Sequence, residues 1–145
     1  AAMLALLAWP GATEEVRVGD LLIERPWSRA TPAGARVAGG YMVITNAGQE
    51  PDRLVGGIAP FAGRIEIHEM AMEGGVMRMR PLAEGLEIPA GGSVTLEPGG
   101  YHVMFMDLQE PLVEGEDRTA TLEFRKAGTV DLDFAVAPMG ARAPR

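Results

Sequence analysis

The sequence predicts an all-β fold, an antiparallel sandwich or barrel of about eight short strands. Glycine (19 residues) and proline (11 residues) recur at short intervals in the 145-residue chain, which leaves little room for a helix of three turns. Apolar and polar residues alternate in several short runs, and turn sequences such as NAGQEPD, MEGG, PAGG and EPGG separate these runs. Short strands at this spacing are typical of sandwiches and barrels.

The predicted strands follow one another along the chain, each with an apolar face for a core. In order, they lie at residues 20–24, 37–45, 54–58, 64–68, 76–80, 94–96, 101–108, 121–124 and 130–136. The alternation is longest in the last of these, where four apolar residues oppose Asp131, Asp133 and Ala135. Residues 25–36 (RPWSRATPAGAR) interrupt the series, and we expect an ordered loop there because Trp27 would be unusual in a flexible spacer.

The length of the chain indicates one domain, which we place at residues 13–140, large enough to form a core without disulfides or a structural metal. Residues 1–12 (AAMLALLAWPGA) are an apolar run that ends in small residues, as in the remnant of a signal peptide. We therefore expect a periplasmic or other extracytoplasmic location. Whether this segment is cleaved or anchors the protein to a membrane stays open, and a docked or disordered terminus is the alternative. Residues 141–145 are expected to form a C-terminal tail.

The composition argues against several classes of function. The net charge of −7 disfavours nucleic acid or an anionic membrane as a partner and fits a cation or a basic protein surface. Without cysteine, the chain has no disulfide, iron–sulfur ligand, thiolate nucleophile or blue-copper thiolate. No serine nucleophile motif is present, and Glu66, Glu69 and Glu73 are typical of solvated edge charges. We therefore expect that the protein is not an enzyme.

The sequence GGYHVMFMDL places one of the two histidines beside two methionines. Side chains two apart on a strand point the same way, so His102, Met104 and Met106 share one face, and Tyr101, Val103 and Phe105 share the other. The aromatic and aliphatic face suffices for a core. We therefore expect His102 and Met104 at a solvent-accessible edge.

A second group of the same residue types precedes it, in HEMAMEGGVMRM. Both histidines and six of the nine methionines fall between residues 68 and 106. His68 and Met70 share a face, and Met77 and Met79 share a face across the turn at residues 74–75. If that turn closes a hairpin, one histidine meets several thioethers, and the later strand can add its own histidine and methionine.

This donor set favours Cu(I) over other metals. Thioether sulfur is a soft ligand that does not titrate, and neutral imidazole is a borderline donor. Magnesium and calcium prefer hard oxygen ligands, and zinc prefers thiolate, imidazole and carboxylate. The alternative is packing, because methionine is an adaptable core filler. In that case the chain is a metal-free β-sandwich whose methionine-rich face binds a partner or another copy of itself.

The sequence also resembles a known family, the PCuAC-type copper chaperones found outside the cytoplasmic membrane of bacteria. The resemblance covers residues 26–136, through RPWSRATPAGARVAGGYMVITNAG, DRLVGG, IHEM, GVMRMRP, GGYHVMFMDL and LEFRKAGTVDLDFAV. The family pattern is a His, a Met further along, and then His-X-Met. Here ten residues separate His68 from Met79, and twenty-two separate Met79 from His102-Val103-Met104.

The resemblance implies a cupredoxin-like β-sandwich that binds one Cu(I) per chain. The implied ligands are His68, Met79, His102 and Met104; Met77, Met70 and Met106 are further candidates, and the choice between Met77 and Met79 stays open. The implied function is delivery of copper to the CuA centre of cytochrome c oxidase. The expected partners are the CuA-bearing subunit or another copper carrier, and the protein itself is expected to be a monomer.

Overall fold

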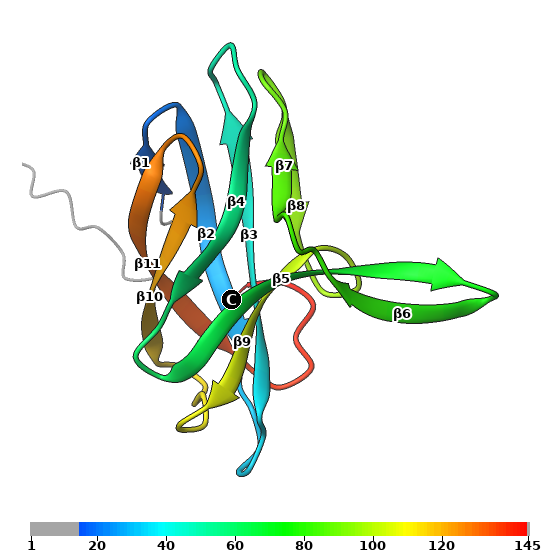
Figure 1. Cartoon of the computed structure of the whole chain (residues 1–145). Helices are drawn as coiled ribbons and strands as arrows, with labels where there is room; N and C mark the ends of the chain where they lie inside the picture. The colour runs from blue at the N-terminus through cyan, green and yellow to red at the C-terminus, as the bar shows by residue number, and fades with distance from the viewer. Residues whose placement is uncertain (1–14, 145) are drawn as a thin grey trace, which may run out of the picture.

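The structure, a computed structural model, describes residues 15–144, and these form strands and turns without an α-helix (Figure 1). The strands are β1 (Glu15–Val18), β2 (Leu21–Arg29), β3 (Val37–Asn46), β4 (Asp52–Ile58), β5 (Ala62–Glu73), β6 (Val76–Pro81), β7 (Leu86–Ile88), β8 (Ser93–Leu96), β9 (His102–Leu108), β10 (Asp117–Phe124) and β11 (Gly128–Ala137). No helix suited to crossing a membrane occurs in this range. The predicted signal or anchor segment, residues 1–12, lies outside the described residues.

The strands form one hydrogen-bonded path in the order β6-β5-β9-β3-β2-β11-β10-β4-β7, with β1 beside β2 and β8 beside β3. The path folds into a β-sandwich that is not closed into a barrel, because β6 and β7 end the path without pairing with each other in residues 15–144. The all-β prediction is confirmed. The expected count of about eight strands is too low, and the expected purely antiparallel arrangement is wrong in one pair, since β2 and β11 run parallel.

Strand β2 is longer than the alternation predicts, so the expected loop at residues 25–36 is wrong in its first part. Arg25 takes a positive φ of 50°, and the pairing of β2 with β3 shifts register between Glu24 and Trp27. This bulge accommodates Pro26, which has no N–H to donate to a ladder. The chain then continues as strand to Arg29. β1 and β7 were also not predicted, and β7 has only three residues, too few to establish an alternation.

The core forms where the alternation is clearest. In β11, Leu132, Phe134 and Val136 are buried, and Asp131 and Asp133 are exposed, as predicted. Val103 and Phe105 of β9 are fully buried, and the ring of Phe105 meets those of Phe61 and Phe134 edge-on. Tyr101 was expected in this core and is exposed instead. It precedes β9 and makes only an isolated bridge to Leu96, so no strand covers it.

A smaller cluster holds the end of β2 against β3. The rings of Trp27 and Tyr41 lie 4.6 Å apart between centroids, and Ala137 and Ala141 pack against them. The Nε of Arg29 donates a hydrogen bond to the carbonyl oxygen of Ala141 at 2.7 Å. The first residue of the expected tail, residues 141–145, therefore contacts the sandwich. The domain boundaries at residues 13 and 140 stay predictions.

We expect Gly57→Ala to lower the free energy of unfolding by about 1–3 kcal/mol. A Cβ at this position of β4 would collide with the carbonyl oxygen of Thr121 and lie 3.1 Å from the Cα of Leu122, both backbone atoms of β10. Gly92→Ala is the matched control, because its Cβ would meet nothing nearer than 3.4 Å; we expect a change within about 0.5 kcal/mol. Urea unfolding measures both, and equal stabilities would contradict the prediction.

Candidate metal centre

The two histidines face each other across neighbouring strands. β5 and β9 pair antiparallel, and His68 lies directly opposite His102 in their register. The two ring centroids are 5.6 Å apart, with 55° between the ring planes. Because the register places both side chains on one face, residues 34 positions apart in the chain form a single imidazole pair.

Each imidazole has one nitrogen held by a hydrogen bond and one without a partner. Nε2 of His68 lies 2.8 Å from Oε1 of Glu66, and Nδ1 of His102 lies 3.0 Å from the carbonyl oxygen of Gly100. Because a carbonyl only accepts, Nδ1 of His102 carries the proton. The other two nitrogens, His68 Nδ1 and His102 Nε2, are buried without a hydrogen-bond partner among residues 15–144. Metal-binding histidines have this arrangement, with one nitrogen oriented by a neighbour and the other free.

A hollow of about 240 Å³ opens beside the histidine pair. Its sulfur and imidazole lining comes from three strands: Met70 of β5, Met79 of β6, and His102 with Met104 of β9. The remaining lining residues are Arg29, Val37, Ala38, Gly39, Tyr41, Pro98 and Gly99. His68 does not line the hollow itself, and its ring lies alongside that of His102. One imidazole and three thioethers therefore line the hollow, and the second imidazole, that of His68, lies next to the ring of His102.

The expectation that His102 and Met104 lie at a solvent-accessible edge is wrong. Their exposed fractions are 5% and 6%, and that of His68 is 7%. Side chains of neighbouring strands lie around this face, among them Tyr41 of β3, Met70 of β5 and Met79 of β6. Met79 is different, because it lies on the terminal strand β6 and is 48% exposed. Met79 is therefore the most exposed of the methionines that line the hollow.

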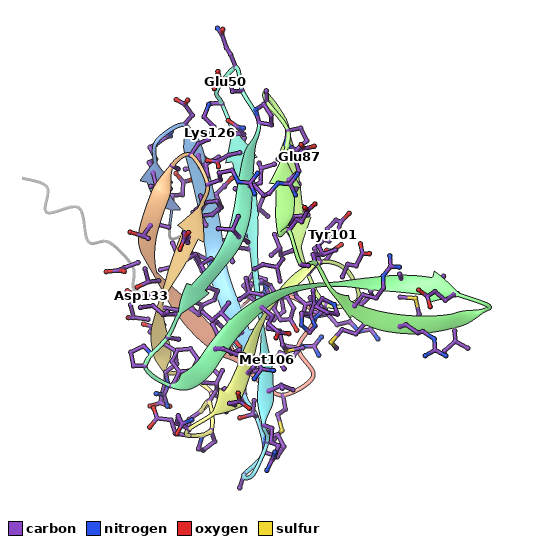
Figure 2. All side chains as sticks on the ribbon, in the orientation of Figure 1. Glu50, Glu87, Tyr101, Met106, Lys126 and Asp133 are labelled. Atoms are coloured by element: carbon purple, nitrogen blue, oxygen red, sulfur yellow. The ribbon has the colours of Figure 1, made fainter. Side chains whose placement is uncertain are left out.

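The remaining candidate methionines do not line this hollow. Met77 pairs with Met72, one step further out along the β5–β6 hairpin than the Met70–Met79 pair. Met106 lies between Val37 of β3 and Arg64 of β5, toward the other end of β9 (Figure 2). Figure 2 also shows yellow sulfur atoms along the projecting hairpin and at its base. Of the two methionines that the sequence spacing left open, Met79 lines the hollow and Met77 does not, and the ligand itself stays a prediction.

The surroundings keep His102 neutral and Glu66 ionised. Burial lowers the pKa of His102, and the nearby His68 adds to this effect, while the hydrogen bond to Gly100 partly opposes it. The hydrogen bond from His68 lowers the pKa of Glu66, with a further contribution from Arg64. Glu66 was expected to be only a solvated edge charge, and instead it orients the ring of His68. A neutral imidazole is the form that binds a metal.

Sequence reasoning did not identify Tyr41 and Arg29 as neighbours of the site. The guanidinium of Arg29 lies 5.7 Å from the centroid of the Tyr41 ring, and both side chains line the hollow. The ring of Tyr41 lies against Gly39, two residues earlier on the same strand. A Cβ on Gly39 would collide with the hydroxyl group of Tyr41, so this position requires glycine. The glycine pair preceding Tyr41, in AGGYM, was the only signal of this close approach.

The donor set is soft. Within the described part of the chain, no three His, Asp or Glu side chains come together in a group that could hold a metal ion. The site instead offers two imidazole nitrogens and up to three thioether sulfurs. Such donors suit a soft monovalent ion better than magnesium, calcium or zinc.

Sequence comparison identifies relatives over most of the chain. Residues 21–136 match the family described as "Putative lipoprotein LpqE-like". The protein named "Putative lipoprotein Lxx21020" from Leifsonia xyli subsp. xyli is 32% identical over 107 residues, which cover 74% of this chain. The matched part is 63% of that protein, so this chain spans less than two thirds of its relative.

Structural comparison identifies the same kind of domain. The copper-bound PCuAC domain from PmoF2 superposes with a TM-score of 0.74 and 32% identity, over 86% of this chain and 98% of that domain. The solution structure of CuI-DR1885 from Deinococcus radiodurans has a TM-score of 0.62 and 30% identity, over 86% of this chain and 80% of that protein. The resemblance inferred from the sequence is confirmed: this chain belongs to the LpqE-like family, which is the PCuAC-type family.

Proposed function

We propose that this protein binds one Cu(I) ion through His68, Met79, His102 and Met104 and carries it to another protein outside the cytoplasm. The observation that supports this most directly is the imidazole pair. Each ring is anchored through one nitrogen, and each has a second, buried nitrogen without a hydrogen-bond partner among residues 15–144; the ring of His102 also lines the hollow together with three methionines. Buried polar atoms are normally hydrogen-bonded, so two such orphans side by side favour a ligand that is bound there.

Copper is the metal that this chemistry favours. Imidazole and thioether are neutral, so binding Cu(I) leaves a single positive charge in the site and needs no carboxylate to balance it. The copper-bound PCuAC domain from PmoF2 and CuI-DR1885 support the same metal and, for the second, the same oxidation state. Met79 is preferred to Met77 as a ligand because it lines the hollow and Met77 does not.

A carrier must release its metal, and the position of Met79 suits release. Three of the four proposed ligands are buried, and Met79 is half-exposed on a strand that ends the sheet path. A ligand from an acceptor protein can therefore replace this thioether before the other three bonds break. The thioether takes up no proton when it leaves, so loss of this ligand adds no pH dependence of its own to the exchange.

The proposed acceptor is the CuA-bearing subunit of cytochrome c oxidase, with another copper carrier as the alternative. The family resemblance supports the first, and the net charge of −7 suits an acceptor with a basic surface. The lipoprotein descriptions of the matched family and of the Leifsonia protein support a location outside the cytoplasm, at a membrane.

The binding test is an anaerobic titration with one equivalent of Cu(I) in competition with a chromophoric chelator. We expect the protein to withdraw one equivalent from the chelator. An X-ray absorption spectrum of the loaded protein should then show both nitrogen and sulfur neighbours. Failure of the folded protein to compete would contradict the proposal and favour the metal-free interaction module.

We expect Met104→Leu to separate ligation from packing. Leucine nearly conserves the volume of this buried side chain, so the free energy of unfolding should fall by less than about 1.5 kcal/mol. Cu(I) affinity should fall at least about tenfold, because losing even a residue that orients a metal ligand costs that much. Chelator competition and urea unfolding measure the two effects. Unchanged affinity would remove Met104 from the site, and a large loss of stability would favour a packing role.

A further inference from the structure

The outer part of the β5–β6 hairpin is a two-stranded ribbon that projects from the sandwich (Figure 1). β5 pairs with β9 from Ala62 to His68, and beyond that point β5 pairs with β6 alone, as far as Glu73 and Val76. We call residues 69–80 the methionine ribbon. Its inner end meets the candidate metal centre, and its outer end lies in solvent.

The two faces of the methionine ribbon differ in chemistry. One face has two cross-strand methionine pairs, Met70 opposite Met79 and Met72 opposite Met77. The charged residues are on the other face, where Glu69 and Glu73 form ion pairs with Arg80. The ion pairs therefore bring the strands together without occupying the sulfur face.

Packing among residues 15–144 does not explain the outer methionine pair. Met72 is 68% exposed and Met77 is 47% exposed, and every residue of β6 is exposed. A core methionine fills gaps between other side chains, whereas these two are largely exposed. Exposed apolar side chains that cluster often mark a surface that binds a ligand or a partner.

The register brings the sulfur atoms within reach of a common ion. Directly opposed side chains of an antiparallel pair have Cβ atoms about 4.5–5.5 Å apart, and same-face neighbours on one strand lie about 7 Å apart. Methionine side chains have three rotatable bonds and can converge over these distances. Met72 and Met77 oppose each other, and Met70 is the next residue on the same face.

We propose that Met70, Met72 and Met77 form a second, weaker Cu(I) site, through which copper enters and leaves the site with the two histidines. This inference rests on the proposed function of the inner site. Met70 is shared between the two locations, because it lines the inner hollow and neighbours Met72. Copper moves inward by ligand exchange: bonds to the sulfurs of Met72 and Met77 break as bonds to the nitrogens and sulfurs of the inner site form. It remains Cu(I), the thioethers release and take up no proton, and the imidazoles bind it in their neutral form.

The test compares the parent protein with the double variant Met72→Leu/Met77→Leu, in which the apolar bulk is kept and both thioethers are lost. The parent should bind a second equivalent of Cu(I), and the double variant should bind it at least about tenfold more weakly. The first equivalent should bind equally to both. The double variant should also take up the first equivalent more slowly from a Cu(I)–chelator donor. Met139→Leu, at an exposed methionine outside the ribbon, is the matched control and should behave as the parent.

A direct readout comes from NMR of protein labelled with ¹³C at the methionine ε-methyl groups. The first equivalent of Cu(I) should shift the resonances of Met79 and Met104, and the second should shift those of Met72 and Met77. If the double variant binds the second equivalent of Cu(I) as tightly as the parent, or if the Met72 and Met77 resonances do not shift, the outer site is ruled out and the inner site is unaffected. If the parent does not bind the first equivalent, the proposed function is contradicted instead.

Discussion

Replacing His102 with leucine should lower Cu(I) affinity by at least about a hundredfold and leave the protein folded. The change removes one of only two imidazoles in the chain, and with it an Nε2 that is buried without a hydrogen-bond partner among residues 15–144, in a residue that lines the hollow beside three methionines. Leucine introduces no polar atom into this buried position. The hydrogen bond to Gly100 is lost, but that oxygen lies in a half-buried turn where water can replace the imidazole. We therefore expect a stability change within about 1.5 kcal/mol.

Chelator competition measures the affinity, and urea unfolding checks the fold. Met106→Leu is the matched control, because Met106 lies on the same strand and the same face but outside the hollow. We expect that control to retain the parent affinity. A His102→Leu protein that binds Cu(I) as tightly as the parent would contradict the proposed site. Loss of affinity in the control would return Met106 to the ligand set.

Cu(I) affinity should fall steeply as the pH falls, because protons compete with the metal for the imidazoles alone. Well below the histidine pKa values, the affinity should change by at most about two log units per pH unit, one for each imidazole, and above about pH 7.5 it should be flat. Burial lowers the pKa of His102, so its proton competes only below the ordinary histidine value of about 6.5. A weaker thioether site should remain at low pH.

The same shift has a consequence for the metal-free protein. A histidine with a lowered pKa in the folded state binds its proton more readily in the unfolded state, so its contribution to stability is complete above about pH 6.5 and is lost as the pH falls through the folded value.

Competition titrations between pH 5 and 8.5, corrected for protonation of the chelator, test the predicted pH dependence of Cu(I) affinity. An affinity independent of pH would exclude both histidines. A single-proton slope would leave one histidine in the site.

Several features of the fold and the site follow from short-range patterns in the sequence. In β11, alternation identified Leu132, Phe134 and Val136 as core residues, because successive side chains of a strand point to opposite faces and the apolar set of this strand lies on one face. The hairpin at Met70 and Met79 was foreseen for a similar reason, since Gly74 and Gly75 both take the positive φ that a tight turn requires. The expectation of a soft metal ion also follows from residue identity, because thioether is a soft donor and imidazole a borderline donor in any fold.

The tertiary structure decided which faces are covered and which strands are neighbours. The pattern identified the His102 and Met104 face as surplus to a two-layer core, but only the side chains that distant strands bring over this face, such as Tyr41 and Met70, show that it is buried. The role of Glu66, the approach of Tyr41 and the parallel pairing of β2 with β11 also depend on contacts between distant segments. Alternation is set by the geometry of one strand. Coverage depends on how the whole chain folds back, and residues adjacent in the sequence carry little information about it.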